Sequence, residues 1–367
     1  MTFGKLGDRL KIPDEMLLRL SDLDNPYSVP FYDGAVSVSH YANAVNVTLG
    51  EAGTLSGDLR KLQISLKAKG FDPENLMNVS GEFDEATAVA IQKMADALST
   101  AGFSGYGTPG KSGALGDYTS NTKFNIKTVV AYNMYVTYGT SSNAVKAGKS
   151  AIAVAAVQAG LPYNFVAGVA SQESGFYPCN ESMDFAGGTK MAQTSWNVPI
   201  VTSGPGKNSP PLIEYKGEKR VVRRAQGLMQ LTIGTGLGLC AKHGVTDIEQ
   251  AVAMIRTPAS NAMLGAEYLR DNILAIEKDE SLYSWVKATA AQSNWSGLGK
   301  ATGHEPIKLL EYAMSAIMYN MGSGNLNSQL NKLSSMTYTV SNGKYTCDTN
   351  GAGYSAGVLN YIFSNAN

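Results

Sequence analysis

The sequence has few of the residues that build metal sites or disulfide frameworks. Its 367 residues include three cysteines and three histidines. Cys179, Cys240 and Cys347 lie far apart, and neither a CxxC pair nor an HExxH helix occurs. Zinc sites and disulfide-stapled folds use such close spacings. We therefore expect no metal ion, no other cofactor and no disulfide scaffold.

The sequence also lacks an excess of charge of either sign. Lys+Arg and Asp+Glu both number 30, so the formal net charge is zero. This balance gives no electrostatic reason to expect nucleic acid or an anionic membrane as a partner.

No long, strongly apolar run is present. Residues 151–170 are rich in alanine rather than leucine and contain Pro162 and Asn164, whereas a membrane-spanning helix needs ~20 predominantly apolar residues. We interpret this stretch as two buried helices that break at Leu161-Pro162, and expect no stable membrane insertion. The chain starts with neither an apolar core nor a small-residue cleavage site, so we expect no signal peptide.

The first hundred residues divide into two parts. Residues 1–50 mix Pro, Gly, Asp, Tyr and Ser with short valine alternations, which predicts an irregular N-terminal segment. Residues 51–100 carry two apolar stripes at helical spacing, which predict a small helical bundle. The stripes consist of Leu59, Leu62 and Leu66, and of Thr87, Ala90, Ile91, Met94 and Leu98.

This bundle resembles the peptidoglycan-binding repeat found beside many cell-wall hydrolases. The resemblance implies a three-helix module that binds peptidoglycan. One departure is that the usual acidic residue before Gly81 is missing. The matching residues are Leu62-Gln63, Leu66, Gly70-Phe71, Gly81-Glu-Phe83, Thr87 and Val89-Ala-Ile91-Gln92.

Residues 101–143 are predicted to be a linker. Gly, Ser and Thr are dense between Gly102 and Gly116, as is typical of flexible connections. Further on, apolar and aromatic residues favour short strands or extended structure over residues 124–139. They are Val129, Val130, Tyr132, Met134, Val136 and Tyr138.

In the remaining part, residues 144–367, an apolar helix is predicted to end on Glu173. Ser174-Gly175 and Pro178 follow directly and mark the end of that helix. A carboxylate at the end of a buried helix loses solvation, which raises its pKa. A general acid that works near neutral pH requires such a carboxyl group.

Three further segments follow, of which two carry residues suited to a sugar site and one, the helix around Gly265, is interpreted as scaffold. In Gly227–Gln230 the glycine permits close backbone approach, and Met229-Gln230 offers an apolar wall and an amide. Asn261, Gly265 and Tyr268 share one face of a predicted helix, where Gly265 indicates tight helix packing.

The last segment is a helix that we expect to stop at Gly322. Tyr319 and Asn320 lie at its end, where a hydroxyl and an amide can orient a neighbouring carboxylate and a substrate amide.

In this order, the four segments resemble the catalytic domain of the soluble lytic transglycosylases and the related goose-type lysozymes. The family pattern runs Glu-Ser-Gly-Phe, Gly-Leu-Met-Gln, Asn…Gly…Tyr-Leu and Tyr-Asn…Gly. The resemblance covers residues 147–365, including a closing helix around Tyr354…Tyr361. It implies a mainly α fold, with a lysozyme-like helical catalytic domain beside the three-helix binding domain and the irregular segment.

The resemblance also implies roles for single residues. Glu173 would be the catalytic acid that protonates the glycosidic oxygen, and the Tyr319 hydroxyl would hold Glu173 in place. Substrate-binding positions would be Ser174, Ser182, Met229, Gln230, Tyr268, Tyr319 and Asn320.

The largest departure from the family is an insertion at residues 183–224. Loops of this length within compact domains are usually functional. Two interpretations stay open: the insertion walls the sugar groove with Trp196 as a stacking platform, or it is a plain solvated loop.

Only one carboxylate occupies a motif position, whereas most glycosidases need two. A lytic transglycosylase suits this count, so we predict non-hydrolytic cleavage of the β-1,4 bond between N-acetylmuramic acid and N-acetylglucosamine. A hydrolytic goose-type lysozyme is the alternative, with a second acid from Glu181, Asp184 or Glu214. A non-catalytic, wall-binding virion protein is another.

A binding module followed by a catalytic domain resembles the modular endolysins of bacteriophages that infect Gram-negative hosts. The resemblance implies a bacteriolytic phage enzyme whose partner is the host's periplasmic peptidoglycan. The enzyme would be released at lysis or carried in the virion, where residues 1–50 would contact other virion proteins.

Overall fold

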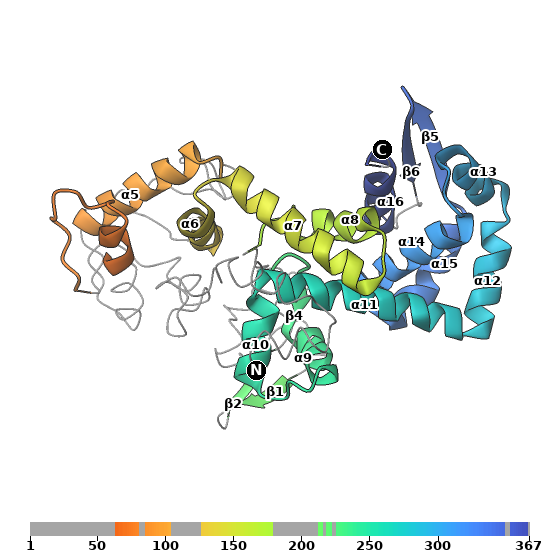
Figure 1. Ribbon diagram of the computed structural model, residues 1–367, viewed down its shortest axis with the longest axis horizontal. Coiled ribbons are helices and arrows are strands. Elements are labelled where there is room, and N and C mark those ends of the chain that lie inside the picture. Colours follow the sequence, from red (N-terminus) through yellow and green to blue (C-terminus); the bar gives the residue numbers. More distant parts are fainter. Residues whose placement is uncertain are drawn as a thin grey trace.

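The computed structural model describes residues 63–80, 85–103, 126–178, 212–215, 218–221, 225–348 and 353–365. In these ranges the fold is mainly helical, as the sequence predicts, with short antiparallel strand pairs (Figure 1). The predictions for residues 1–50, Ser182 and Trp196 lie outside the described residues.

The N-terminal unit, which we define as residues 63–103 and 126–138, is a helical assembly around its own core. A helix over residues 63–68 leads into a loop, and α5 (Glu85–Thr100) and α6 (Ile126–Tyr138) follow. The large buried side chains of this core include Leu66, Phe71, Met77, Ile91, Met94, Phe103 and Tyr132. Leu66 and the whole second stripe of the sequence are therefore buried as their spacing predicts, whereas Leu59 and Leu62 lie outside the described residues.

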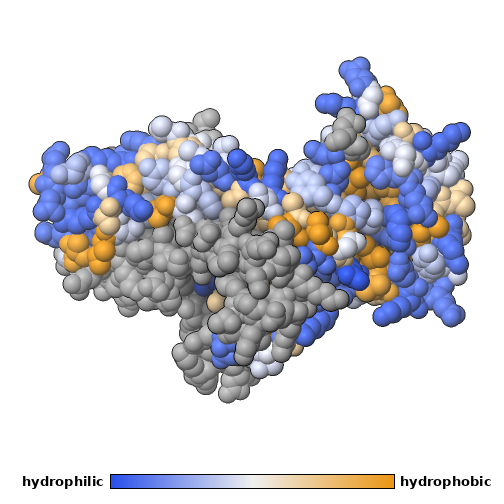
Figure 2. Space-filling model, viewed as in Figure 1, coloured by the Kyte–Doolittle hydropathy of each residue, from blue (hydrophilic) through white to orange (hydrophobic). Residues whose placement is uncertain are grey.

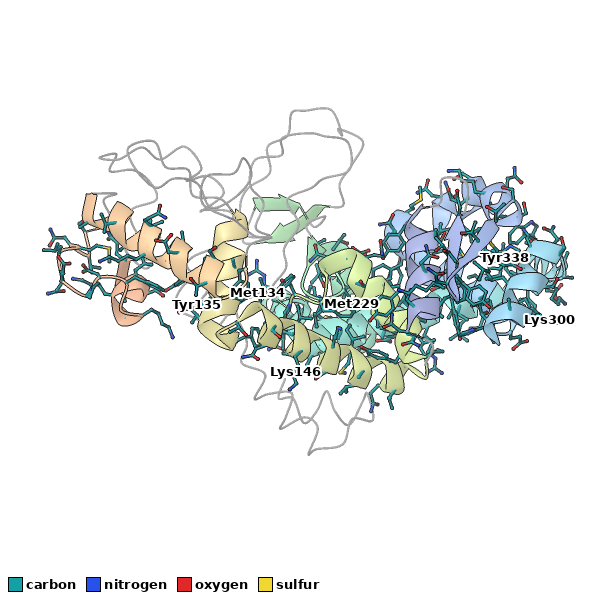
Figure 3. The ribbon with its side chains drawn as sticks, turned by 90° about the horizontal axis from the view of Figure 1, so that it is seen from above. Met134, Tyr135, Lys146, Met229, Lys300 and Tyr338 are labelled. Atoms are coloured by element: carbon teal, nitrogen blue, oxygen red, sulfur yellow. The ribbon has the colours of Figure 1, made fainter. Side chains whose placement is uncertain are left out.

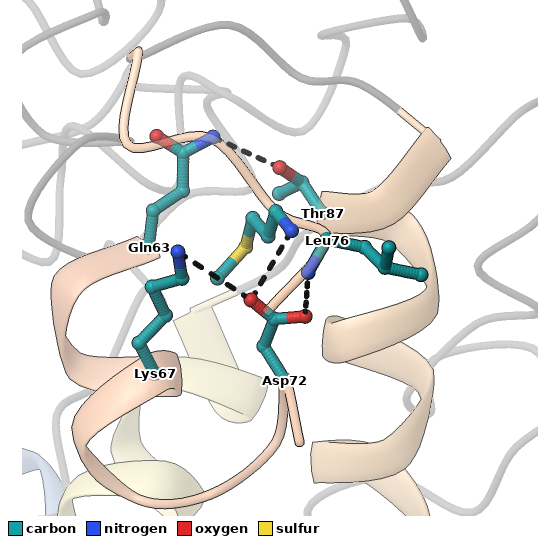
Figure 4. A network of polar contacts seen from close by, with 6 residues as sticks. Gln63, Lys67, Asp72, Leu76 and Thr87 are labelled. Atoms are coloured by element: carbon teal, nitrogen blue, oxygen red, sulfur yellow. Dashed lines mark hydrogen bonds and ion pairs between the residues drawn. The ribbon is translucent and has the colours of Figure 1, made fainter. Parts of the chain in front are cut away.

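The loop that follows the first helix is held by Asp72 (Figure 4). Its carboxylate accepts the backbone N–H groups of Leu76 at 2.9 Å and Met77 at 3.1 Å. Lys67 Nζ lies 3.6 Å from the same carboxylate. These bonds satisfy backbone groups that the turn would otherwise leave without partners.

The prediction of strands over residues 124–139 is wrong, because this stretch contains helix α6. Ala131, Tyr132 and Met134 are fully buried in the N-terminal unit, and the Tyr132 hydroxyl lies 2.7 Å from Ser65 Oγ. Tertiary packing thus outweighs the β propensity of valine and tyrosine. The predicted linker, residues 101–143, consequently contains part of the N-terminal core.

The next two helices are α7 (Ser141–Ala159) and α8 (Tyr163–Ser174). Gly160, with φ +66°, ends α7, and Pro162 is the N-cap of α8. The predicted break at Leu161-Pro162 is confirmed. Within the described ranges no helix is both long and apolar enough to cross a membrane.

The C-terminal part of the chain, from α7 onward, contains a second, larger core, to which most of the remaining helices contribute. At its centre α11 (Pro258–Lys278) packs against both α7 and α14 (Pro306–Met321). The helices that pack against α11 or α14 are α9 (Ile233–Lys242), α10 (Ile248–Arg256), α12 (Glu280–Ala290) and α13 (Ser293–Thr302). Gly322 caps α14, as the sequence predicts.

The C-terminal elements close the domain over α8 and α14. The 3₁₀ helix η3 (Ser323–Gln329), α15 (Leu330–Ser334), the hairpin of β5 (Thr337–Ser341) and β6 (Lys344–Asp348), and α16 (Gly353–Ser364) follow in order. The side chain of Asn360 accepts the Cys347 N–H at 2.6 Å and so ties the hairpin to α16. α16 also packs along α8 and α14.

Two short strand pairs precede α9. β1 (Leu212–Tyr215) pairs with β2 (Glu218–Val221), and β3 (Ala225–Gln226) pairs with β4 (Leu231–Thr232). The residues between β3 and β4 make the tight Gly227–Gln230 turn, which lies beside α11.

Candidate active site

Helix α8 presents Glu173 one residue before its C-terminal end. The preceding residues from Phe165 to Ala170 are buried, whereas Glu173 itself is partly exposed. Gly175 adopts the left-handed conformation, with φ +60°, and ends the helix. A substrate can therefore reach a carboxyl group whose surroundings are largely apolar.

A small residue in α8 brings another helix close to Glu173. A Cβ atom on Gly168 would lie 3.1 Å from the Val358 carbonyl oxygen of α16. This close approach places Tyr354, near the start of α16, beside Glu173. The Tyr354 hydroxyl donates a hydrogen bond of 2.6 Å to Glu173 Oε1.

The surroundings of Glu173 favour its protonated form near neutral pH. Burial raises the pKa of Glu173 to about 7, because an ionised carboxylate is poorly solvated there. Hydrogen bonds from Tyr354 and Asn320 oppose this rise, because they stabilise the ionised form. Both forms of the group are thus accessible near pH 7.

The prediction that the Tyr319 hydroxyl forms a hydrogen bond with Glu173 is wrong. The Tyr319 hydroxyl donates its single proton to the carbonyl oxygen of Met229 at 2.5 Å. Burial, and then the nearby charge of Glu173, raise the pKa of Tyr319 well above its usual range. Tyr354 takes the role expected of Tyr319, and Tyr319 instead links α14 to the Gly227–Gln230 turn.

Asn261 of α11 holds the Gly227–Gln230 turn. Its Oδ1 accepts the Met229 N–H at 2.8 Å, and its Nδ2 donates to the Ile255 carbonyl at 2.7 Å. A Cβ atom on Gly227 would lie 2.6 Å from Asn261 Cγ, so glycine is required there. Gly227 and Gln230 both have positive φ, +75° and +46°.

Met229 fills the space that Gly265 leaves on α11. A Cβ atom on Gly265 would lie 2.6 Å from Met229 Cβ, which explains the glycine as the sequence predicts. The Met229 side chain is fully buried, in the middle of the catalytic domain (Figure 3). It therefore belongs to the core, and the predicted sugar contact is not available to it.

The predicted substrate position Ser174 is also buried. Its hydroxyl donates to the Ala170 carbonyl at 3.1 Å and accepts the Phe176 N–H at 3.1 Å. These bonds close the end of α8, so we interpret Ser174 as structural.

The other predicted positions differ in their access to solvent. Asn320 is exposed beside Glu173, and Tyr268 is partly exposed, with its ring centroid 5.4 Å from that of Tyr319. Gln230 is buried, and its Nε2 donates to the Gly227 carbonyl at 2.8 Å. Around Glu173 the structure therefore gathers the Tyr354 hydroxyl and the Asn320 amide, with Tyr319 and Tyr268 behind them.

Sequence patterns pointed to Tyr354 only as part of a closing helix. Its role depends on a contact with a residue 181 positions away. The feature of the sequence that could have indicated this role is Tyr354 itself, an aromatic residue at the start of an apolar helix that follows the Tyr319-Asn320 segment.

These features define the class of the protein. Among the described residues, no group of His, Cys, Asp and Glu side chains could hold a metal ion. The chemistry available at Glu173 is proton transfer by one partly exposed carboxyl group in a helical domain. Such a carboxyl group is suited to acid-catalysed cleavage of glycosidic bonds by an enzyme with a lysozyme-like helical domain.

Residues 150–338 match the model of the transglycosylase SLT domain, and the chain belongs to this family. No curated protein and no solved structure matches the chain. The resemblance of the four sequence segments to lytic transglycosylases is confirmed at the level of the family. The protein is thus an enzyme with the general activity of this family, lytic cleavage of peptidoglycan.

Proposed function

We propose that Glu173 is the acid–base catalyst that cleaves the β-1,4 bond between N-acetylmuramic acid and N-acetylglucosamine, leaving a 1,6-anhydromuramic end. The observation that carries this proposal is a partly exposed carboxyl group with a pKa of about 7, held by Tyr354 at 2.6 Å. A general acid is most effective when its pKa lies near the working pH.

In the first step, protonated Glu173 gives its proton to the glycosidic oxygen as the bond from that oxygen to C1 of the muramoyl sugar breaks. The substrate's own N-acetyl group stabilises the positive charge at C1. Tyr354 and Asn320 stabilise the carboxylate that forms, since both hydrogen-bond to Glu173.

In the second step, the Glu173 carboxylate removes the proton from the C6 hydroxyl of the muramoyl sugar. O6 then bonds to C1 and closes the 1,6-anhydro ring. Glu173 ends protonated, and no water is consumed. One carboxyl group therefore suffices for both steps.

The change Glu173→Gln tests the catalyst. We expect loss of clearing of purified sacculi and a fall in kcat of at least about 100-fold, the contribution typical of general acid–base catalysis. Glu280→Gln, on the exposed start of α12, is the matched control and should keep full activity. Clearing that survives Glu173→Gln would mean that another residue is the catalyst.

The product tests the reaction. Mass spectrometry of the digest should find anhydromuramic ends after reaction in ¹⁸O-labelled water, and no label in the glycan. Labelled reducing ends would instead show a hydrolytic, goose-type lysozyme reaction.

We further propose that the N-terminal unit binds peptidoglycan, as its resemblance implies. A groove of about 450 Å³ runs beside α5, with Phe71, Leu76 and Val89 among its lining residues. Leu76 and Val89 are 65% and 49% exposed, and Figure 2 shows hydrophobic surface on this unit at left. Glu74 and Lys93 add one charge of each sign to the lining.

Val89→Glu tests this binding role. We expect less protein to sediment with purified sacculi, while turnover of a short soluble muramoyl glycan stays unchanged. Ile64→Glu replaces another exposed apolar residue, one that does not line the groove, and should leave sedimentation as it is. Equal loss in both variants would contradict a specific role of the groove.

The biological role that we propose is that of a bacteriophage lysin acting on host periplasmic peptidoglycan, either released at lysis or carried in the virion. The order of a binding unit before the transglycosylase domain supports this proposal. Protein directed to the periplasm of a Gram-negative cell should lyse it, and the Glu173→Gln variant should not.

A further inference from the structure

The residues that follow Glu173 divide between the two cores of the molecule. Phe176 is buried in the core of the catalytic domain, with its ring centroid 5.9 Å from that of Tyr361. Tyr177, the next residue, packs against the core of the N-terminal unit instead. Its ring centroid lies 6.4 Å from that of Phe103.

The contact of Tyr177 extends to the start of α7. The Tyr177 hydroxyl lies 2.6 Å from Ser141 Oγ. The Ser141 N–H donates to the carbonyl oxygen of Ala101, directly after α5, at 2.9 Å. Tyr177 thus connects the end of α5, the first residue of α7 and the segment that leaves α8.

The backbone between Glu173 and Tyr177 is closely held, so a displacement of Tyr177 would also displace Glu173. Phe176 has φ +68°, a conformation that a phenylalanine adopts only when its surroundings impose it. Ser174 holds this turn through the Phe176 N–H at 3.1 Å and the Tyr177 N–H at 3.2 Å. A Cβ atom on Gly148 of α7 would lie 2.1 Å from the Phe176 carbonyl oxygen, so α7 closes the other side.

We infer that Tyr177 is a positioning residue, through which the N-terminal unit holds the last turn of α8 and with it Glu173. The inference rests on the proposed role of Glu173. Phe103 and Ser141, which Tyr177 contacts, lie outside the transglycosylase match at residues 150–338. The N-terminal unit then has two roles: it helps to position Glu173, and it binds peptidoglycan.

The test compares Tyr177 with a tyrosine that serves only the N-terminal unit. Tyr135 of α6 is that control, because it packs in the same core, with its ring centroid 6.2 Å from that of Phe71. Figure 3 shows Tyr135 near α6, well away from Met229 in the catalytic domain. The substrate is a short soluble muramoyl glycan, whose turnover does not depend on attachment to sacculi.

We expect Tyr177→Ala to lower kcat on the soluble glycan by about tenfold with little change in KM, because acid catalysis is sensitive to small displacements of the acid. Tyr177→Phe, which keeps the ring, should recover most of this loss. The kcat of Ser141→Ala should equal that of Tyr177→Phe. The kcat of the double variant should be no lower than that of either single variant, since all three remove the same hydrogen bond. Tyr135→Ala should keep kcat.

The inference is overturned if Tyr177→Ala keeps kcat on the soluble glycan and weakens only sedimentation with sacculi. Should Tyr177→Ala fail to fold, Tyr177→Leu takes its place, because it keeps an apolar side chain but loses the ring that contacts Phe103 and the hydroxyl that contacts Ser141. Full kcat in Tyr177→Leu would then overturn the inference. Failure of the proposed function is distinguishable, because Glu173→Gln would then stay active whatever the Tyr177 variants do.

Discussion

At the scale of single residues, the pKa of Glu173 predicts how activity depends on pH. The acid must carry its proton, so kcat/KM should fall as pH rises through about 7. Tyr354→Phe removes a donor that stabilises the carboxylate, so the pKa of Glu173 should rise further. The alkaline limb of the kcat/KM profile should then move to higher pH while the maximum falls. An unmoved limb would contradict the assignment.

The same pKa predicts an effect on stability. The pKa of Glu173 is about 7 in the folded protein against an ordinary value of 4.5, so between these values the folded state holds a proton that the unfolded chain has lost. Stability therefore decreases as pH rises from about 4.5 through about 7, by up to about 3 kcal/mol. Glutamine does not titrate, so the Tm of Glu173→Gln minus that of the unchanged protein should increase as pH rises from about 4.5 through about 7. Melting curves at pH 4.5 and 8.5 check this, and an equal Tm difference at both would contradict it.

At the scale of elements, the site depends on how closely the Gly227–Gln230 turn lies against α11. Gly265→Ala would bring a Cβ atom within 2.6 Å of Met229 Cβ. We expect a loss of about 1–3 kcal/mol in the free energy of unfolding, typical of overpacking. Activity should fall too, because Met229 accepts the Tyr319 hydrogen bond.

The matched control for Gly265→Ala is Gly238→Ala on α9. Gly238 is exposed, and an added Cβ atom meets nothing within 4 Å. Alanine favours a helix interior over glycine, so this variant should gain about 0.5–1 kcal/mol. Chemical denaturation measures both free energies. If both variants change stability in the same direction, the proposed contact with Met229 is not what requires Gly265.

At the scale of the whole molecule, α7 belongs to both cores. Ala144 is buried in the N-terminal core, and Ala151, two turns further, in the core of the catalytic domain. Since one helix and Tyr177 connect the two, we expect them to unfold in one cooperative transition. Calorimetry should show a single peak, which Tyr135→Ala shifts as a whole to lower temperature. An earlier, separate peak for the N-terminal unit would contradict this coupling.

Local signals in the sequence predicted much of the helical structure. The break at Leu161-Pro162, the end of α14 at Gly322 and the place of Glu173 at the end of α8 all follow from proline, glycine and apolar periodicity. These features depend on neighbours within a few residues, so the sequence displays them directly. The strand prediction for α6 was wrong because burial against distant residues outweighed local propensity.

The sequence by itself determined the family's motif residues, the single carboxylate in a motif position and the apolar helix that ends on it. Only the tertiary structure decided which tyrosine meets that carboxylate, since Tyr354 and Glu173 are 181 positions apart. It also decided that Met229 and Ser174 serve packing and helix closure, and that Tyr177 reaches the N-terminal unit. The physical reason is that long-range contacts depend on the shapes of packed helices, which no local spacing records.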